Sequence, residues 1–108
     1  MGHKKEAQYD LDVAQVLVEH AKYSISKRAR INLLNHGYLP KETIEDVFAA
    51  IRCSHFYKSV ELENRPNTHA DIYRHVPCYG TEWYVKYFLD ENGPVITIWS
   101  LKEDGYQF

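Results

Sequence analysis

Apolar residues recur at helical spacing through the first half of the chain. Over residues 10–22 they return every three to four positions, which predicts an amphipathic helix with Asp10 as its N-terminal cap. A short interruption follows, after which Ser24 or Ser26 can cap a second helix over residues 27–34. The start of the chain is therefore expected to be helical.

A third helix is expected after a glycine turn. Gly37 suits the left-handed position that ends the second helix, and Pro40 suits the first turn of the next one, where a missing N–H is tolerated. The apolar side chains of this helix fall on one face, so it should pack against a sheet: Ile44, Val47, Phe48 and Ile51.

The second half of the chain shows the shorter period that is typical of strands. We expect four strands, at residues 54–61, 70–76, 82–89 and 95–101, with turns at 63–67, 77–80 and 90–94. Short connections favour an antiparallel meander. The last strand is almost continuously apolar, which predicts a central position covered on both faces. Helices followed by strands indicate an α+β fold.

Length and composition describe one ordinary globular domain. With 108 residues, 44% hydrophobic and 26% charged, we expect a polar, frayed segment at residues 1–9 and a single domain at 10–108. No apolar stretch approaches the length of a membrane span and no signal-peptide pattern follows Met1, so a cytoplasmic location is expected. Cys53 and Cys78 are then expected to be reduced thiols.

The charge pattern restricts any anion-binding site to a few side chains. The net charge is −2, which argues against binding nucleic acid through bulk electrostatics. Residues 53–108 hold five Lys/Arg and eight Asp/Glu. An anion site in this half must therefore be built locally from converging cations.

Alternation along the predicted strands brings such cations together. In the third strand Tyr84 and Lys86 share the face opposite the apolar core residues, and in the second strand Arg74 lies on the face opposite Tyr73. If the strands pair so that four side chains converge, they form a cationic site with a phenol and no pair of carboxylates: Lys58, Arg74, Tyr84 and Lys102.

That chemistry suits a phosphodiester. Cleaving RNA without a metal requires positive charge at the pentavalent transition state and groups that accept and donate protons, roles open to Tyr, Lys or His with perturbed pKa values. Exposed aromatics such as Tyr57, Tyr73 or Tyr84 would stack on bases. The alternative is an ordinary solvated sheet face, on which Tyr–Lys pairs are common.

Other polar clusters have ordinary interpretations beside chemical ones. The spacing of His69, His75 and Cys78 matches no closed zinc pattern, so we expect no metal. His55 and His69 are acid–base candidates or polar surface residues. The basic run at 27–30 is a solvated helix face or a contact for RNA or an acidic partner.

Four segments, in this order and spacing, resemble a known family. They are His55-Phe56-Tyr57-Lys58-Ser59, Asp71-Ile72-Tyr73-Arg74, Trp83-Tyr84-Val85-Lys86 and Ser100-Leu101-Lys102-Glu103. Together they are similar to the MqsR-type toxins of bacterial type II toxin–antitoxin systems, which are related in fold to RelE. The similarity covers about residues 8–103.

The resemblance implies a fold, an activity and partners. The fold would be N-terminal helices packed on one face of a small, mainly antiparallel sheet of four or more strands. The activity would be sequence-selective, metal-independent cleavage of mRNA that inhibits translation, without a cofactor. The partners would be mRNA and a protein antitoxin, with DNA contacted only through the antitoxin.

The resemblance also implies roles for individual residues. Lys58 and Lys102 would stabilise transition-state charge, Tyr84 would transfer a proton or orient the substrate, and Arg74 would bind phosphate. Four further residues are candidates for substrate binding: Lys86, Tyr57, Tyr73 and His69.

One position departs from the family pattern. Ala70 stands where the family has Gln before the Asp-Val-Tyr-Arg segment, and alternation points the neighbouring His69 to the opposite face. Activity or sequence preference can therefore differ. The alternative function is a catalytically inactive module of the same fold that binds protein or nucleic acid.

Overall fold

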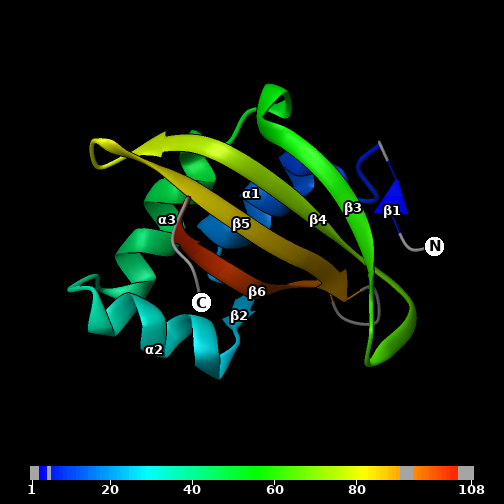
Figure 1. Cartoon of the computed structure of the whole chain (residues 1–108), viewed down its shortest axis with the longest axis horizontal. Helices are drawn as coiled ribbons and strands as arrows, with labels where there is room; N and C mark the ends of the chain where they lie inside the picture. The colour runs from blue at the N-terminus through cyan, green and yellow to red at the C-terminus, as the bar shows by residue number, and fades with distance from the viewer. Residues whose placement is uncertain (1–2, 5, 91–93, 105–108) are drawn as a thin grey trace.

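The computed structural model describes residues 3–4, 6–90 and 94–104 and confirms the α+β fold (Figure 1). The helices are α1 (Leu11–Glu19), α2 (Lys27–Asn35) and α3 (Pro40–Ala50), followed by a 3-10 turn, η1 (Cys53–His55). The strands are β1 (His3–Lys4), β2 (Tyr23–Ile25), β3 (Phe56–Leu62), β4 (Arg65–Cys78), β5 (Thr81–Asp90) and β6 (Val95–Glu103). Among these residues no helix is long and apolar enough to cross a membrane.

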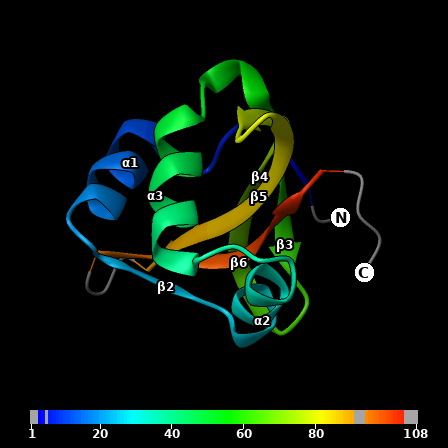
Figure 2. The same ribbon diagram turned by 90° about the vertical axis from the view of Figure 1, so that its left-hand side faces the viewer.

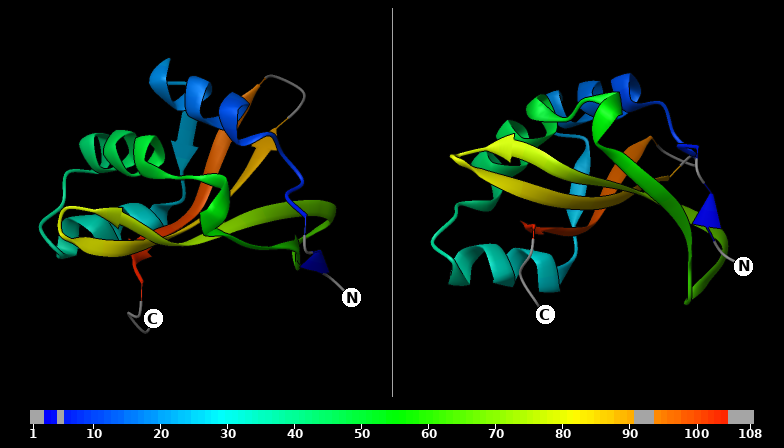
Figure 3. Two further views of the ribbon diagram at one scale, coloured as in Figure 1. Left: turned by 90° about the horizontal axis from the view of Figure 1, so that it is seen from above. Right: turned by 45° about the horizontal axis from the view of Figure 1, so that its top comes forward.

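The strands form one mixed sheet in the order β1-β3-β4-β5-β6-β2. All neighbours pair antiparallel except β2, which runs parallel to β6. Helices α1 and α3 cover one face of this sheet, as Figures 2 and 3 show, and α2 packs against β6. The opposite face, which neither α1 nor α3 covers, is called the open face below.

The core lies between α1, α3 and the covered face. The apolar stripe predicted for the third helix is fully buried: Ile44, Val47, Phe48 and Ile51. Alternate residues of β5 are fully buried as well: Trp83, Val85 and Tyr87. Tyr84 and Lys86 point to the other face and are only half-buried. The predicted faces of β5 are therefore correct.

The helix ends follow the predicted chemistry. The Asp10 side chain accepts from the N–H of Asp12, and Ser26, rather than Ser24, caps α2 by accepting from the N–H of Ala29. Gly37 follows α2 with φ +84°, and Pro40 is the first residue of α3. Each cap satisfies an N–H or carbonyl that the helix itself leaves unpaired.

The segment expected only to interrupt the first two helices is in fact a strand. Tyr23, Ser24 and Ile25 pair in register with Ile96, Thr97 and Ile98 of β6. Three residues are too few to show an alternating pattern, so this strand depends on tertiary pairing. It encloses β6 between two neighbours, which confirms the predicted central position.

Two other expectations about the strands are wrong. β4 begins at Arg65, so the turn expected over 63–67 shrinks to residues 63–64. β6 is not covered on both faces, because Ile96, Ile98 and Leu101 are buried while Trp99 is exposed. The turn expected at 90–94 falls largely on residues 91–93, and most of the tail after β6 is residues 105–108; both ranges lie outside the described residues.

The N-terminal segment contacts the sheet at two points. His3 and Lys4 pair with β3, and the fully buried carboxylate of Asp71 accepts from the N–H groups of Gln8 and Tyr9, both at 2.9 Å. Residues 1, 2 and 5 lie outside the described residues, so fraying there stays a prediction.

Candidate active site

Strand register places the predicted catalytic side chains on the open face. Lys58 of β3 pairs with Ile72 of β4, which in turn pairs with Lys86 of β5. Tyr84 of β5 pairs with Lys102 of β6. Register partners project to the same face of a sheet, so these side chains form two adjacent rows across four strands.

Cation–π contacts link neighbouring side chains of these rows. The Lys102 Nζ lies 4.9 Å from the centroid of the Tyr84 ring. The Lys58 Nζ and the Arg74 Cζ lie 5.1 Å and 5.3 Å from the centroid of the Tyr57 ring. We call this cluster the cationic site: Tyr57, Lys58, Arg74, Tyr84, Lys86 and Lys102. It brings together all four residues predicted to be catalytic.

A β-bulge exposes Tyr57. The pairing of β3 with β4 shifts between Phe56 and Lys58, so Tyr57 is the extra residue. Its ring is 51% exposed, whereas Phe56 packs against the core. Strict alternation would have placed Tyr57 and Lys58 on opposite faces. Because of the bulge, the Tyr57 ring lies beside the Lys58 ammonium at the open face.

Partial burial, together with neighbouring positive charge, lowers the pKa of two lysines. Partial burial lowers the pKa of Lys86, and the nearby charge of Lys58 lowers it further. Partial burial also lowers the pKa of Lys102, with additional lowering by the charge of Arg28 and smaller effects from Lys86 and Arg74. Cations held this close together favour the binding of an anion such as phosphate.

The phenol of Tyr84 stays protonated at neutral pH. Burial raises its pKa above the ordinary value of 10.0, and the charge of Arg74 opposes that rise only in part. A neutral phenol beside the Lys102 ammonium can donate a hydrogen bond or a proton, so the site contains a donor next to its cations.

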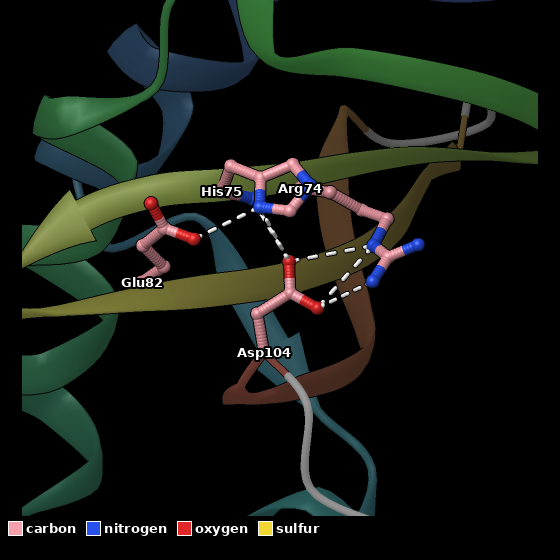
Figure 4. Close-up of polar contacts among 4 residues, drawn as sticks. All are labelled: Arg74, His75, Glu82 and Asp104. Atoms are coloured by element: carbon pink, nitrogen blue, oxygen red, sulfur yellow. Dashed lines mark hydrogen bonds and ion pairs between the residues drawn. The ribbon is translucent and has the colours of Figure 1, made fainter.

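An acidic residue that the sequence-based predictions missed enters the site from the position directly after β6 (Figure 4). Asp104 accepts from Arg74 Nη2 at 2.8 Å and from Arg74 Nε at 3.3 Å, and it also accepts from the N–H of His75 at 3.0 Å. Its side chain is only 6% exposed. Asp104 comes two positions after Lys102, and this alternation was the signal that could have placed it on the same face.

The Asp104 carboxyl remains ionised. Burial alone would raise its pKa, but the hydrogen bond and charge of Arg74, together with the N–H of His75, hold the pKa below the ordinary value of 3.8. His75 occupies a bulge in β4 with φ +61°, and its Nδ1 lies 2.9 Å from Glu82 Oε1. Arg74 is therefore held at the rim of the site by an acidic neighbour.

Two predicted substrate-binding residues lie away from the cationic site. Tyr73 is 2% exposed and stacks on Tyr87 in the core, so its expected role as an exposed stacking aromatic is wrong; alternation turns it toward the helices. His69 lies on the same side as Tyr73, and its carbonyl oxygen accepts from the Tyr9 hydroxyl at 2.7 Å. Ala70 is fully buried beside Leu62 and Phe88.

Cys53 and Cys78 are free thiols, as expected. Across the described part of the chain, no three His, Cys, Asp or Glu side chains gather as a metal-ligand group.

Fold and site together define a small α+β protein whose open sheet face presents cations and phenols. Over residues 6–103 the chain matches the family described as "Motility quorum-sensing regulator, toxin of MqsA". Because this match spans nearly the whole chain, the protein belongs to the MqsR toxin family, a family of toxins of toxin–antitoxin systems. The resemblance drawn from the four segments is thereby confirmed. Among curated proteins, none matches the chain.

Proposed function

We propose that this toxin is a metal-independent endoribonuclease that cleaves mRNA at selected sequences and so inhibits translation. The observation that carries the proposal is the convergence of Lys58, Arg74, Tyr84 and Lys102 on one open face. In a protein of net charge −2, Lys58, Arg74, Lys86 and Lys102 share this face. Such a patch can hold a polyanion locally without attracting nucleic acid over its whole surface.

The reaction would be attack of a 2′-hydroxyl on the adjacent phosphorus, with departure of the 5′-oxygen. Lys58 and Lys102 would stabilise the negative charge that develops on the phosphoryl oxygens, and Arg74 would bind one of those oxygens. Tyr84 would give its proton to the departing 5′-oxygen. The proton of the 2′-hydroxyl would pass to the amine of Lys86, whose pKa is lowered by burial and by the charge of Lys58.

Substrate would have to compete with Asp104 for Arg74. The Arg74 guanidinium is about one-third exposed even while it is paired, so a phosphate can approach its free side. Tyr57, which is exposed beside Arg74, would stack on a base near that phosphate. Lys86 would add charge in the middle of the site.

The partners follow from the family and the substrate. The family is named as the toxin of MqsA, so we propose a protein antitoxin that neutralises this chain and makes any contact with DNA. Action on mRNA places the protein in the cytoplasm. No cofactor is required by the proposed steps, because lysine, arginine and tyrosine supply every role in them.

The experiment compares induced expression of the wild type with Lys58→Ala, Tyr84→Ala and Lys102→Ala, scoring growth and the 5′ ends of total mRNA by primer extension. We expect growth arrest with new discrete 5′ ends for the wild type and relief in all three variants. Lys41→Ala is the matched control, since Lys41 is an exposed α3 lysine paired with Glu45. Growth arrest that persists in all three variants would contradict the assignment.

A second candidate is a non-catalytic binding module. It is favoured by Ala70, which stands where the family has Gln, and by the pairing of Arg74 with Asp104. The same experiment separates the two. Harmless expression of a folded wild type, with intact mRNA, would favour the binding module.

A further inference from the structure

A recess adjoins the cationic site, between α2 and strand β6. Its walls include Arg28 and Asn32 of α2 and Trp99 and Lys102 of β6, and the cavity between them measures about 60 Å³. Figure 1 shows α2 near β6 and β2. Lys102 belongs both to this recess and to the cationic site, so a chain bound at one continues directly into the other.

The geometry of the recess is fixed by Ser26. Its backbone N–H donates to the carbonyl oxygen of Ile98 at 2.9 Å, and its hydroxyl donates to the carbonyl oxygen of Trp99 at 3.0 Å. The same hydroxyl accepts from the N–H of Ala29 as the cap of α2. The helix that carries Arg28 is thus attached to the strand that carries Trp99.

Trp99 presents an aromatic surface to this recess. It is the extra residue of a bulge in β6, where the pairing with β5 shifts between Lys86 and Tyr87, and it is 37% exposed. Its ring contacts Phe88 at a centroid distance of 6.2 Å, which supports it from the sheet side. A supported, partly exposed indole is a suitable stacking surface for a base.

The polar groups of the recess match the rest of a nucleotide. The Asn32 side-chain amide can donate and accept hydrogen bonds at a base edge, and Arg28 supplies a guanidinium for phosphate. Arg28 is near enough to Lys102 for its charge to contribute to the lowered pKa of that lysine. Arg28 therefore extends the line of cations beyond the cationic site.

We propose that this recess binds one nucleotide of single-stranded RNA next to the phosphate held at Lys102, with its base on Trp99, its base edge at Asn32 and its phosphate at Arg28. The inference rests on the proposed ribonuclease function and deepens it, because it locates a subsite for sequence selection. It also gives the basic run of α2 a function, through Arg28.

Intrinsic fluorescence tests the subsite directly. The chain has two tryptophans, and Trp83 is 0% exposed, so an added ligand can quench only Trp99 by stacking. The probe is a 2′-O-methylated RNA hexamer, which cannot be cleaved because its 2′-oxygens carry no proton. We expect saturable quenching in the wild type and loss of that quenching in Trp99→Phe, which keeps an aromatic ring in place.

Affinity provides the second measurement. In the anisotropy of a labelled hexamer, Trp99→Ala is expected to weaken binding about 5- to 150-fold, the span of base–aromatic stacking. Asn32→Ala should reduce the preference among hexamers of different sequence about tenfold. Arg30→Gln is the matched control for Arg28→Gln, since Arg30 is an exposed residue of the same helix outside the recess.

Failure of the subsite and failure of the proposed function give different results. Quenching that depends on Trp99, in a wild type that cleaves no RNA, would support the subsite and contradict the proposed ribonuclease function. Cleavage by the wild type with hexamer affinity unchanged in Trp99→Ala and Asn32→Ala, both shown to be folded by circular dichroism, would overturn the subsite and leave the ribonuclease standing.

Discussion

At the scale of single residues, the neighbours of each cation decide what it can do. The ammonium groups of Lys58 and Lys102 lie over phenol rings. Arg74 instead shares its guanidinium between the Tyr57 ring and the Asp104 carboxylate. The four catalytic candidates were named from the sequence, but Asp104 was missed, because it lies in a tail that looked like a polar extension of the chain.

Replacing Asp104 should separate stability from RNA binding. Asp104→Asn weakens the hydrogen bonds to Arg74 and to the N–H of His75, so the free energy of unfolding should fall by about 1–3 kcal/mol. The same change frees Arg74 for phosphate, so affinity for the uncleavable hexamer should rise several-fold. Glu82→Gln is the control, since Glu82 is an exposed acid whose carboxylate contacts His75. Weaker RNA binding in Asp104→Asn would contradict this account.

The Asp104 carboxyl should also affect stability as a function of pH. Its pKa in the folded chain lies below 3.8, so the folded state holds it ionised while the unfolded state begins to bind a proton. The contribution of this carboxyl to the free energy of unfolding is therefore complete well above pH 3.8. It disappears as the pH falls through the lower pKa of the folded state. Urea unfolding of the wild type and Asp104→Asn across this window should show the two curves converging toward acid. If the difference in free energy of unfolding between the two proteins stayed constant down to the lowest pH, Asp104 would not be the source of this pH dependence.

At the scale of elements, regular segments were predictable and irregular ones were not. Three helices and four strands repeat their patterns over seven or more residues, which is enough to reveal a period. β2 has three residues, and its pairing with β6 is a contact between distant parts of the chain. The bulges at Tyr57 and Trp99 each turn an aromatic side chain in a way that strict alternation cannot anticipate.

The connection between α2 and β6 should depend on one serine. Ser26→Ala removes both the cap of α2 and the hydrogen bond to Trp99, so it should lower the free energy of unfolding by about 1–2 kcal/mol, measured by urea denaturation. Ser24→Ala is the matched control, because Ser24 is exposed in the adjacent strand and should change stability by less than about 0.5 kcal/mol. Equal effects of the two substitutions would show that the Ser26 cap adds nothing to the free energy of unfolding beyond an ordinary surface serine.

At the scale of the whole molecule, a modest negative charge coexists with a cationic open face. The net charge is −2, while Lys58, Arg74, Lys86 and Lys102 share one surface across four strands. This segregation was predictable only in outline. The uneven charge of the two halves showed that an anion site must be local, whereas the strand order β3-β4-β5-β6 determines which cations become neighbours.

Salt should weaken RNA binding in proportion to the number of these cations that reach phosphates. For single strands the slope of log affinity against log salt is about 0.7 per phosphate contact, so four contacts predict a slope of about 3. Lys58→Gln should reduce the slope by about 0.7, measured by hexamer titration from low to moderate salt. Lys41→Gln on the far layer should leave it unchanged, and a slope insensitive to Lys58→Gln would exclude that lysine from phosphate contact.

The position of β6 also determines when the molecule is completed during its synthesis on the ribosome. β6 is the last strand along the described chain, yet it lies between β5 and β2 and carries Trp99 and Lys102, with Asp104 just beyond it. A nascent chain that ends before these residues has helices without their full sheet and a cationic site without Lys102. Translation proceeds from the N-terminus, so the ribosome finishes the site only with the final residues of the domain. Growing chains of this toxin thus acquire the last cation of the site only when the sheet itself is completed.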